Sequence, residues 1–340
     1  MKNFLLTASC LFWLFQNQFV FAQQTIPGTY NPQTKRFETS DKSYYFPESF
    51  QGAYGTFRKD RLMGVIDTSG KIICDAKYVE VEAFSEGLAR VRTEKESGWK
   101  YGLINERGKE VVPAIYDHVD NLYQRRERGG HLLVVGNANE YGFYSREGKL
   151  VVPLRYSKIG NFHMNRAKVR LEVHFGYLNQ EGKVVIPIKY ESADDFSGNV
   201  AQVKLGDYWG AIDTSGNRVI SFVYEQKIVF RNNLGKTKMA GKYGIIDRKE
   251  QIVLPFVYDE ISPFYSSPVA RVKRNGKYGF IDSNAVLIIP VKYEQAGHFD
   301  HHGISCVASG NKWGTINTAG DLVTPMIYDK IQLFHHGYAN

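Results

Sequence analysis

The chain has 340 residues, a formal net charge of +8 and 43% hydrophobic residues, which is enough apolar material for a buried core and argues against disorder. Its 22 Tyr, 21 Phe and 32 Gly against only 5 Met favour strands and tight turns over helices. The basic residues are scattered, with Arg125-Arg126-Glu127-Arg128 as one short cluster, and do not form the stripe typical of nucleic-acid binding.

Residues 1–22 have the organisation of a secretory signal peptide. Lys2 supplies a positive charge, Phe4–Phe15 form an apolar run too short to cross a bilayer, and Ala22 is the small residue that a signal peptidase requires. Cys10 has too little hydrophobic chain before it to act as a lipid-attachment site. No later stretch has about 18 consecutive apolar residues, so we expect no membrane span in the mature chain. The predicted location is the periplasm, the cell surface or the outside of the cell.

The remainder of the chain repeats a residue pair that ends in glycine. The spacings between successive glycines are 38, 40, 34, 34, 34, 35 and 35 residues. A constant period in this range is typical of propellers, solenoids and other arrays. The pairs, whose second members we call the repeat glycines, are Met63-Gly64, Tyr101-Gly102, Tyr141-Gly142, Phe175-Gly176, Trp209-Gly210, Tyr243-Gly244, Tyr278-Gly279 and Trp313-Gly314.

Three further positions keep this register. The repeat tyrosines, fourteen residues after each glycine, are Tyr78, Tyr116, Tyr156, Tyr190, Tyr224, Tyr258, Tyr293 and Tyr328. The repeat phenylalanines, twenty residues after it and once replaced by leucine, are Phe84, Leu122, Phe162, Phe196, Phe230, Phe264, Phe299 and Phe334. The repeat prolines, eleven residues after it, are Pro113, Pro153, Pro187, Pro255, Pro290 and Pro325. We expect the aromatic side chains to form the core, and proline suits the end of an edge strand because it cannot donate to a ladder.

This pattern resembles the WG-repeat, or KWG-repeat, family. The resemblance covers nearly everything from Phe46 to the end, so residues 46–340 are expected to form a domain of eight repeats after a signal peptide (1–22) and an N-terminal linker (23–45). The family has no common catalytic residues to carry over. Local departures from the pattern are Met63 in the first pair, Ser221 in place of proline, and Glu250 and Ala285 in place of a turn glycine.

Each repeat is expected to be a three- to four-stranded antiparallel meander. In the seventh repeat, strands are predicted at Val269–Lys273, Tyr278–Ile281 and Val286–Pro290, with Asn275-Gly276 as a two-residue hairpin turn. The stretch from Tyr293 to Phe299 is either a short fourth strand or a connector. One repeat cannot bury its aromatic face alone, so neighbouring repeats must stack. The predicted fold is an all-β array, either a propeller-like ring or an open solenoid-like array.

Two turns resemble the catalytic loops of aspartic proteases. They are Asp67-Thr68-Ser69-Gly70 and Asp213-Thr214-Ser215-Gly216. Other repeats have asparagine at the same turn position, as in Asn105 and Asn179, and asparagine accepts a turn hydrogen bond but cannot perform acid–base chemistry. We therefore interpret these aspartates as turn residues.

Histidines and cysteines give the other candidate sites. His298, His301 and His302 occupy one loop, and His335 and His336 the equivalent loop of the next repeat. They either form a metal site or belong to duplicated surface loops, and we predict no metal and no cofactor. Cys74 replaces a core aliphatic residue and is expected to be buried, whereas the register places Cys306 on the solvent face, which argues against a disulfide between them.

The sequence favours a non-enzymatic binding module. It contains no Gly-x-Ser-x-Gly, Walker-type loop or His-Glu-x-x-His motif. We expect an exported scaffold whose repeat surface and loops bind a protein, peptide or envelope glycan. The alternative is a hydrolase with a site in the central funnel of a propeller.

Two polar insertions are the predicted recognition loops. They are Thr93–Gly98 and Gln124–Gly130, which lengthen two consecutive repeats. Residues of this kind are expected to project from a rigid scaffold, although tolerated surface insertions would have the same composition. The predicted binding residues are Arg125, Arg126 and Arg128, which would contact an acidic partner.

Export can be tested on the mature N-terminus. Because the apolar run is short and ends at Ala22, we predict that N-terminal sequencing of protein from the expressing cells starts at Gln23. A retained Met1, or an acylated Cys10, would contradict the exported model.

Overall fold

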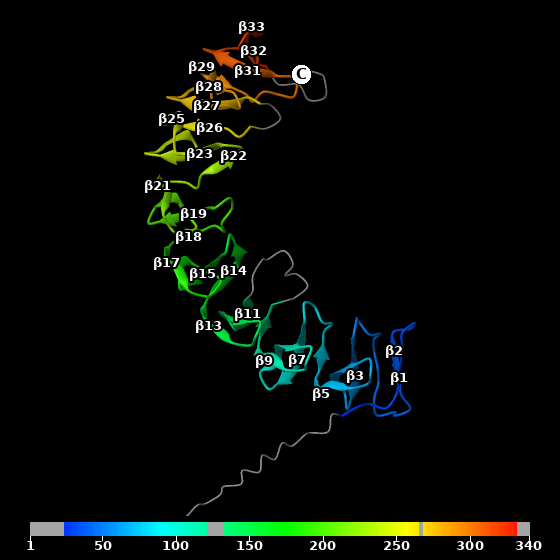
Figure 1. Ribbon diagram of the computed structural model, residues 1–340. Coiled ribbons are helices and arrows are strands. Elements are labelled where there is room, and N and C mark those ends of the chain that lie inside the picture. The colour runs from blue at the N-terminus through cyan, green and yellow to red at the C-terminus, as the bar shows by residue number, and fades with distance from the viewer. Residues whose placement is uncertain (1–23, 121–131, 265–267, 332–340) are drawn as a thin grey trace, which may run out of the picture. The chain divides into compact units, whose positions relative to one another are not determined.

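The computed structural model describes residues 24–120, 132–264 and 268–331, and these are all-β without a helix (Figure 1). They divide into two compact units, Met1–Tyr116 and Asp117–Asn340. All strand pairs are antiparallel between strands that are consecutive in the chain, and no described sheet closes into a barrel. The predicted all-β array of eight repeats is therefore confirmed.

The first unit contains a hairpin and two sheets. The strands of the hairpin are β1 (Thr29–Asn31) and β2 (Arg36–Glu38). Sheet 1 consists of β3 (Tyr54–Lys59), β4 (Leu62–Asp67) and β5 (Ile72–Tyr78). Sheet 2 consists of β6 (Glu80–Val81), β7 (Leu88–Lys95), β8 (Gly98–Asn105) and β9 (Glu110–Tyr116).

The segment 23–45, expected to be a linker, contributes to the folded unit. Its residues Ile26 and Phe37 are buried together with Phe50, Phe57 and Ile66 of the first repeat. The backbone of Ile26 also donates to the carbonyl of Gly70. A terminal repeat has an apolar face without a neighbour, and the β1–β2 hairpin covers that face of sheet 1. The segment is therefore part of the folded unit and not a linker. Its apolar residues are too few to show the two-residue period of a strand in the sequence.

The second unit contains six sheets of four strands each. Sheets 3 and 4 consist of β10 (His118–Val119), β11 (Leu132–Asn137), β12 (Glu140–Ser145) and β13 (Leu150–Tyr156), and of β14 (Lys158–His163), β15 (Arg166–Leu171), β16 (His174–Leu178) and β17 (Val184–Tyr190). Sheets 5 and 6 consist of β18 (Ser192–Ala193), β19 (Val200–Leu205), β20 (Tyr208–Asp213) and β21 (Arg218–Tyr224), and of β22 (Val229–Arg231), β23 (Leu234–Met239), β24 (Lys242–Asp247) and β25 (Ile252–Tyr258). Sheets 7 and 8 consist of β26 (Glu260–Ile261), β27 (Ala270–Arg274), β28 (Lys277–Ile281) and β29 (Leu287–Tyr293), and of β30 (Gln295–Ala296), β31 (Ile304–Ser309), β32 (Lys312–Asn317) and β33 (Leu322–Tyr328).

Sheet 7 shows how the predicted strands compare with the observed ones. Strands β27 and β28 match within a residue, and Asn275 and Gly276 form the predicted left-handed pair with φ of 51° and 79°. Strand β29 continues past Pro290 to Tyr293, so the proline lies within the edge strand and not at its end. The open question about the following stretch is also resolved, because β30 is a short strand that pairs with β31 of the next sheet.

The proline lies in a bulge opposite the repeat glycine. In sheet 5, Trp209 pairs with Tyr224 and Ala211 with Ile220, so three residues of β21 face Gly210 alone. A Cβ atom added at any of the eight repeat glycines would lie only 2.4–2.9 Å from the carbonyl oxygen of the residue ten positions later. The glycine is required because only the absence of a side chain lets the last strand of the sheet, such as β21, approach this closely.

The bulge creates the contacts between neighbouring sheets of the second unit. It turns Phe222 across Gly210 and toward Tyr190 of the preceding sheet, with ring centroids 6.3 Å apart. Tyr224 packs on Phe256 of the following sheet in the same way, at 5.9 Å. Seven of the eight repeat tyrosines are buried, and Tyr328 of the last sheet is 45% exposed. The core is thus a series of interfaces, each filled by side chains from two consecutive repeats.

Two departures from the repeat pattern meet at one of these interfaces. Glu250, which replaces a turn glycine, has a left-handed φ of 64°. Its carboxylate accepts hydrogen bonds from the N–H and the hydroxyl of Ser221, both at 3.0 Å, and from the hydroxyl of Tyr224 at 3.1 Å. Proline at position 221 would have no N–H to donate. The two replacements are therefore complementary, one supplying donors and the other the acceptor.

The close approach at the repeat glycine can be tested with Gly210→Ala. The added Cβ would lie 2.7 Å from the carbonyl oxygen of Ile220, and we expect the free energy of unfolding to fall by about 1–3 kcal/mol. The matched control is Gly160→Ala in β14, where the nearest atoms lie at 3.4 Å. Equal effects of the two substitutions in urea titrations would show that the close approach does not stabilise the sheet.

The complementarity of Ser221 and Glu250 can be tested with a double-mutant cycle. Ser221→Pro and Glu250→Gly each return one position to the repeat pattern and remove the two hydrogen bonds between these residues, while Glu250→Gly also removes the one from Tyr224. The second substitution therefore has less left to remove than the first. We expect the double variant to be more stable than the sum of the two single losses by about 1–3 kcal/mol in urea unfolding. Additive losses would mean that the two replacements are independent.

Candidate binding surface

The predicted contact residues Arg125, Arg126 and Arg128 lie outside the described residues, as do the signal peptide and the insertion Gln124–Gly130. Their role stays a prediction. The other insertion, Thr93–Gly98, is described and does not form the expected projecting loop. It lengthens the β7–β8 hairpin, in which Thr93 pairs with Lys100 and Lys95 with Gly98. The added residues are paired across the hairpin, which satisfies their backbone groups without a long loop.

The two aspartates that resemble protease residues form turns. The Oδ1 atom of Asp67 accepts hydrogen bonds from the backbone of Ser69 at 2.8 Å and of Lys71 at 3.1 Å. Asp213 accepts equivalent bonds from Ser215 and Asn217. The hydrogen bond from the Asn217 side chain, followed by those from the backbone, lowers the pKa of Asp213. The turn interpretation is confirmed, since each carboxylate is bound within its own turn.

The clustered histidines adopt the same kind of turn. Asp300 accepts hydrogen bonds from the backbone of His302 and Ile304, both at 2.9 Å. The ring centroids of His301 and His302 lie 3.8 Å apart, and burial lowers the pKa of His298. His335 and His336 lie outside the described residues. In the part of the chain that the structure describes, no three His, Cys, Asp or Glu side chains are grouped to hold a metal ion.

The two described cysteines are both buried and unbonded. For Cys74 this was expected, and burial raises its pKa to about 11. For Cys306 it corrects the expectation of a solvent-facing position, since only 4% of the residue is exposed. The physical reason is that both faces of a stacked sheet are covered, so alternation along a strand does not point to solvent. At the equivalent position, Gln202, Lys236 and Arg271 face the next sheet.

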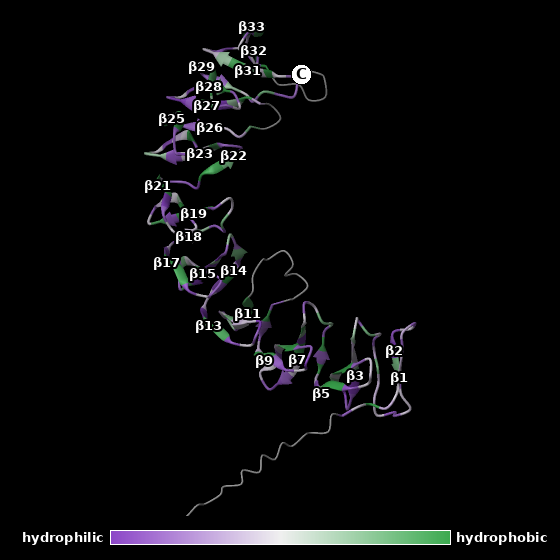
Figure 2. Cartoon of the chain, in the orientation of Figure 1, coloured by the Kyte–Doolittle hydropathy of each residue, from purple (hydrophilic) through white to green (hydrophobic). Residues whose placement is uncertain are grey.

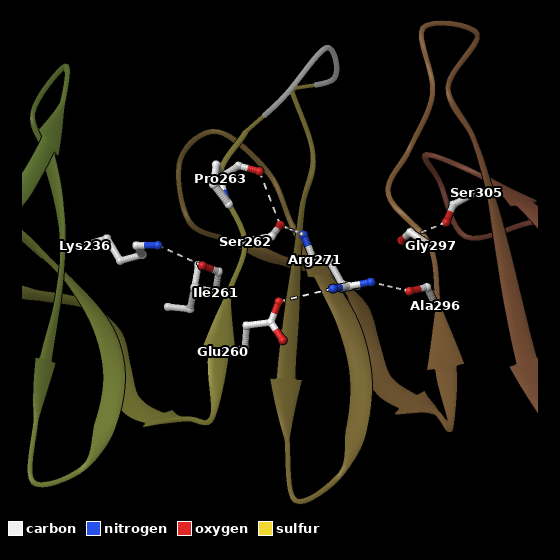
Figure 3. Close-up of polar contacts among 9 residues, drawn as sticks. All are labelled: Lys236, Glu260, Ile261, Ser262, Pro263, Arg271, Ala296, Gly297 and Ser305. Carbon is white, nitrogen blue, oxygen red and sulfur yellow. Dashed lines mark hydrogen bonds and ion pairs between the residues drawn. The ribbon is translucent and has the colours of Figure 1, made fainter. Parts of the chain in front are cut away.

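These three side chains cross from one sheet to the backbone of the next, as Figure 3 shows for two of them. Gln202 donates to the carbonyl of Ile228 and accepts from its N–H, both at 2.9 Å. The Nζ of Lys236 donates to the carbonyl of Ile261 at 2.9 Å. Arg271 donates to the carbonyl of Ala296 and forms an ion pair with Glu260 at 3.1 Å. The row fixes the spacing of adjacent sheets with polar contacts.

A second row, closer to the hairpin turns, pairs a cation with the aromatic residue that precedes each repeat glycine. We call it the cation–aromatic row, and its cross-strand pairs are Arg170–Phe175, Lys204–Trp209, Lys238–Tyr243 and Lys273–Tyr278 of sheets 4 to 7. All eight residues are half-buried. The cation lies 5.6 Å from the ring centroid of Phe175, 5.8 Å from that of Tyr243 and 5.1 Å from that of Tyr278. This contact holds these three cations in place at the surface. At the Trp209 ring the cation is Lys227, 5.8 Å from the centroid, and Lys204 lies opposite the ring in the strand register only.

The row is suited to anionic groups. Among the described residues, Lys204 and Lys273 form no ion pair within 4.0 Å, and the Nε of Arg170 is buried without a hydrogen-bond partner. Between sheets 7 and 8 the row borders a groove of about 350 Å³, lined by Lys273, Tyr278 and Trp313 among others. The carboxylate in this lining, Glu294, is ion-paired with Lys277 at 3.4 Å. Cations held beside aromatic faces can bind carboxylates and also stack against rings.

The aligned repeats contain a signal for this row. When the repeats are aligned on the glycine, the residue six places before it is basic in four consecutive repeats: Arg170, Lys204, Lys238 and Lys273. Only the strand register shows that this residue lies directly opposite the aromatic residue of the pair. A row of scattered single cations therefore becomes a continuous feature after folding.

The profile of the WG containing repeat family matches eight segments of the chain. They are residues 63–96, 101–124, 141–172, 175–209, 209–243, 243–278, 278–313 and 313–340. No curated protein matches the chain. No helix among the described residues is long and apolar enough to cross a membrane.

Several solved structures resemble the chain weakly. A eukaryotic initiation factor is 12% identical with a TM-score of 0.31, covering 84% of this chain and 90% of its own. Hsv2p of Kluyveromyces lactis is 13% identical with a TM-score of 0.28, covering 56% and 73%. The dihydro-heme d1 dehydrogenase NirN is 15% identical with a TM-score of 0.26, covering 90% and 78%. At these scores none of them bears on function.

Proposed function

We propose that this chain, which belongs to the WG containing repeat family, is an exported scaffold that binds an extended acidic partner and performs no catalysis. The observation that carries the proposal is the cation–aromatic row, in which the same pair recurs in four consecutive sheets. The partner is a protein, a peptide or an envelope glycan. Arg125, Arg126 and Arg128 would add further cationic contacts.

A repeated cationic site favours a repeated ligand. Each pair alone contributes a modest attraction at a half-exposed position, because solvent screens a single ion pair. Several pairs on one scaffold that engage the same chain add their contributions without paying the association entropy again. The net charge, +8 for the whole chain and lower by one without Lys2, also raises the encounter rate with an acidic partner. A long acidic chain should therefore be retained where a single carboxylate is not.

Export follows from the predicted signal peptide, and it determines which partners the scaffold meets. With residues 1–22 removed, the mature chain would be in the periplasm, at the cell surface or in the medium. Envelope proteins and glycans with carboxylate groups are then the accessible acidic polymers. This part of the proposal depends on the mature N-terminus and is independent of the row.

The proposal is tested by affinity capture from an envelope extract with a charge-reversed row. We expect the triple variant Lys204→Glu, Lys238→Glu, Lys273→Glu to lose the partners that the wild type captures, because like charges then face each other. The matched control reverses three exposed turn lysines, Lys149→Glu, Lys183→Glu and Lys249→Glu, which changes the net charge equally.

Capture should weaken between low and moderate salt for the wild type and the control, since the contacts are electrostatic. A folded triple variant that captures the same partners as the wild type would contradict a role for the row. A variant shortened across Gln124–Gly130 tests the arginine contacts separately, and unchanged capture by it would remove them from the proposal. A captured partner that is released in cleaved form would indicate the hydrolase alternative.

A further inference from the structure

A cavity of about 540 Å³ lies between sheets 6 and 7 of the second unit. Its apolar lining includes Leu234, Ile245, Ile261 and Phe264, three of them aliphatic. Pockets of roughly 300–1,000 Å³ with an apolar lining and a few polar groups are typical of small-molecule sites. The cavity is separate from the cation–aromatic row, whose residues do not line it.

An aromatic contact that fills three other interfaces of the second unit is missing at this one. In sheets 3, 4 and 7 the residue after the repeat glycine is aromatic and contacts the repeat phenylalanine of the next sheet. The ring centroids are 5.9 Å apart for Phe143 and Phe162, and 4.8 Å for Tyr177 and Phe196. At the sheet 6–7 interface the smaller Ile245 takes the place of the aromatic residue.

The repeat phenylalanine is less buried where the aromatic contact is missing. Phe264 and Phe230 are half-buried, whereas Phe196 and Phe299, which make the contact, are 3% exposed. The preceding interface also lacks the aromatic residue, having Ala211, but there the buried Ile228 belongs to the same core cluster. Ile228 thus occupies, between sheets 5 and 6, a space of the kind that stays open between sheets 6 and 7.

Two cations stand at the cavity, and its described lining contains no carboxylate. Arg231 is exposed, donates to the carbonyl of Phe264 at 3.0 Å, and lies 5.7 Å from the ring of Phe264. Lys236 donates to the carbonyl of Ile261 at 2.9 Å (Figure 3). Neither forms an ion pair with a described residue, and each keeps donors that these single hydrogen bonds do not use.

We propose that this cavity binds an aliphatic carboxylate, with the hydrocarbon chain among Leu234, Ile245 and Ile261 and the carboxylate at Arg231 and Lys236. An apolar chain gains free energy by leaving water for this lining, and a carboxylate can accept charge-assisted hydrogen bonds from both cations. A neutral chain would lack the charge-assisted hydrogen bonds, and a short carboxylate would lack the free energy of burying a hydrocarbon chain. The ligand class is thus a medium-chain fatty acid.

The probe is decanoate, titrated calorimetrically into the full mature chain below its micelle concentration, with decan-1-ol and acetate as comparison ligands. We expect decanoate to bind, decan-1-ol to bind about 10-fold or more weakly, and acetate not to bind. Arg231→Gln with Lys236→Gln should weaken decanoate by a similar factor. The matched control, Lys204→Gln with Lys273→Gln in the cation–aromatic row, should bind decanoate like the wild type.

A cavity-filling variant tests the location of the hydrocarbon chain. Ile245→Phe restores the aromatic pair found at other interfaces, so we expect a folded protein with an unchanged or higher melting temperature and no decanoate binding. If this variant does not fold, the glutamine pair still decides the proposal. Equal binding of decanoate and decan-1-ol, no binding of decanoate to the wild type, or full binding to a folded Ile245→Phe or to the glutamine pair would overturn it. None of these outcomes depends on the acidic partner.

Discussion

The close approach of the last strand of each sheet to the repeat glycine is the constraint on which the rest of the sheet depends. Without a side chain at Gly210, the carbonyl of Ile220 can approach and three residues can bulge against one. The bulge directs Phe222 toward the preceding sheet, where it meets Tyr190. A single missing Cβ therefore sets both the shape of a sheet and its contact with a neighbour, which explains why glycine occurs at this position in all eight repeats.

Equivalent positions serve different ends in different repeats because the backbone is already fixed. The position eight residues before the glycine has glutamine, lysine and arginine in sheets 5 to 7. Their amide, ammonium and guanidinium groups each donate to a backbone carbonyl of the next sheet. In sheet 8 the same position has Cys306, which makes no such contact to a following sheet among the described residues. Hydrophilic and hydrophobic residues alternate along the array in Figure 2. The array is uniform in backbone and variable in surface.

The sequence allowed the repeat, its period, the strand order and the turn aspartates to be predicted, because each follows from local spacing. Asn275-Gly276 specifies its turn by conformation alone. The misses share one cause, which is that they depend on neighbouring sheets. Cys306 was placed in solvent because alternation along one strand ignores the sheet stacked on it. The β1–β2 hairpin was not predicted because its few apolar residues are buried only by packing on sheet 1.

The candidate surfaces show the same limit. The cations of the row are ordinary surface residues in the sequence, and only the cross-strand register places each opposite an aromatic ring. The cavity at Ile245 could be suspected from the aligned repeats, since isoleucine stands where Phe143, Tyr177 and Phe280 stand elsewhere. Whether another side chain fills such a gap, as Ile228 does one interface earlier, depends on a connector whose path has no periodic pattern.

The bulge and its proline also bear on self-association. The last strand lies at one edge of each of the eight sheets and exposes aliphatic side chains, such as the 59% exposed Ile252 and the 58% exposed Leu322. A regular apolar edge of this kind invites pairing with the edge of another molecule. The bulge interrupts the ladder, and proline removes one of its donors. Where sheet 5 has Ser221 instead, its N–H is bonded to Glu250, so that edge too presents no free donor at this position. The repeat thus combines exposed aliphatic side chains with an edge backbone that resists edge-to-edge aggregation.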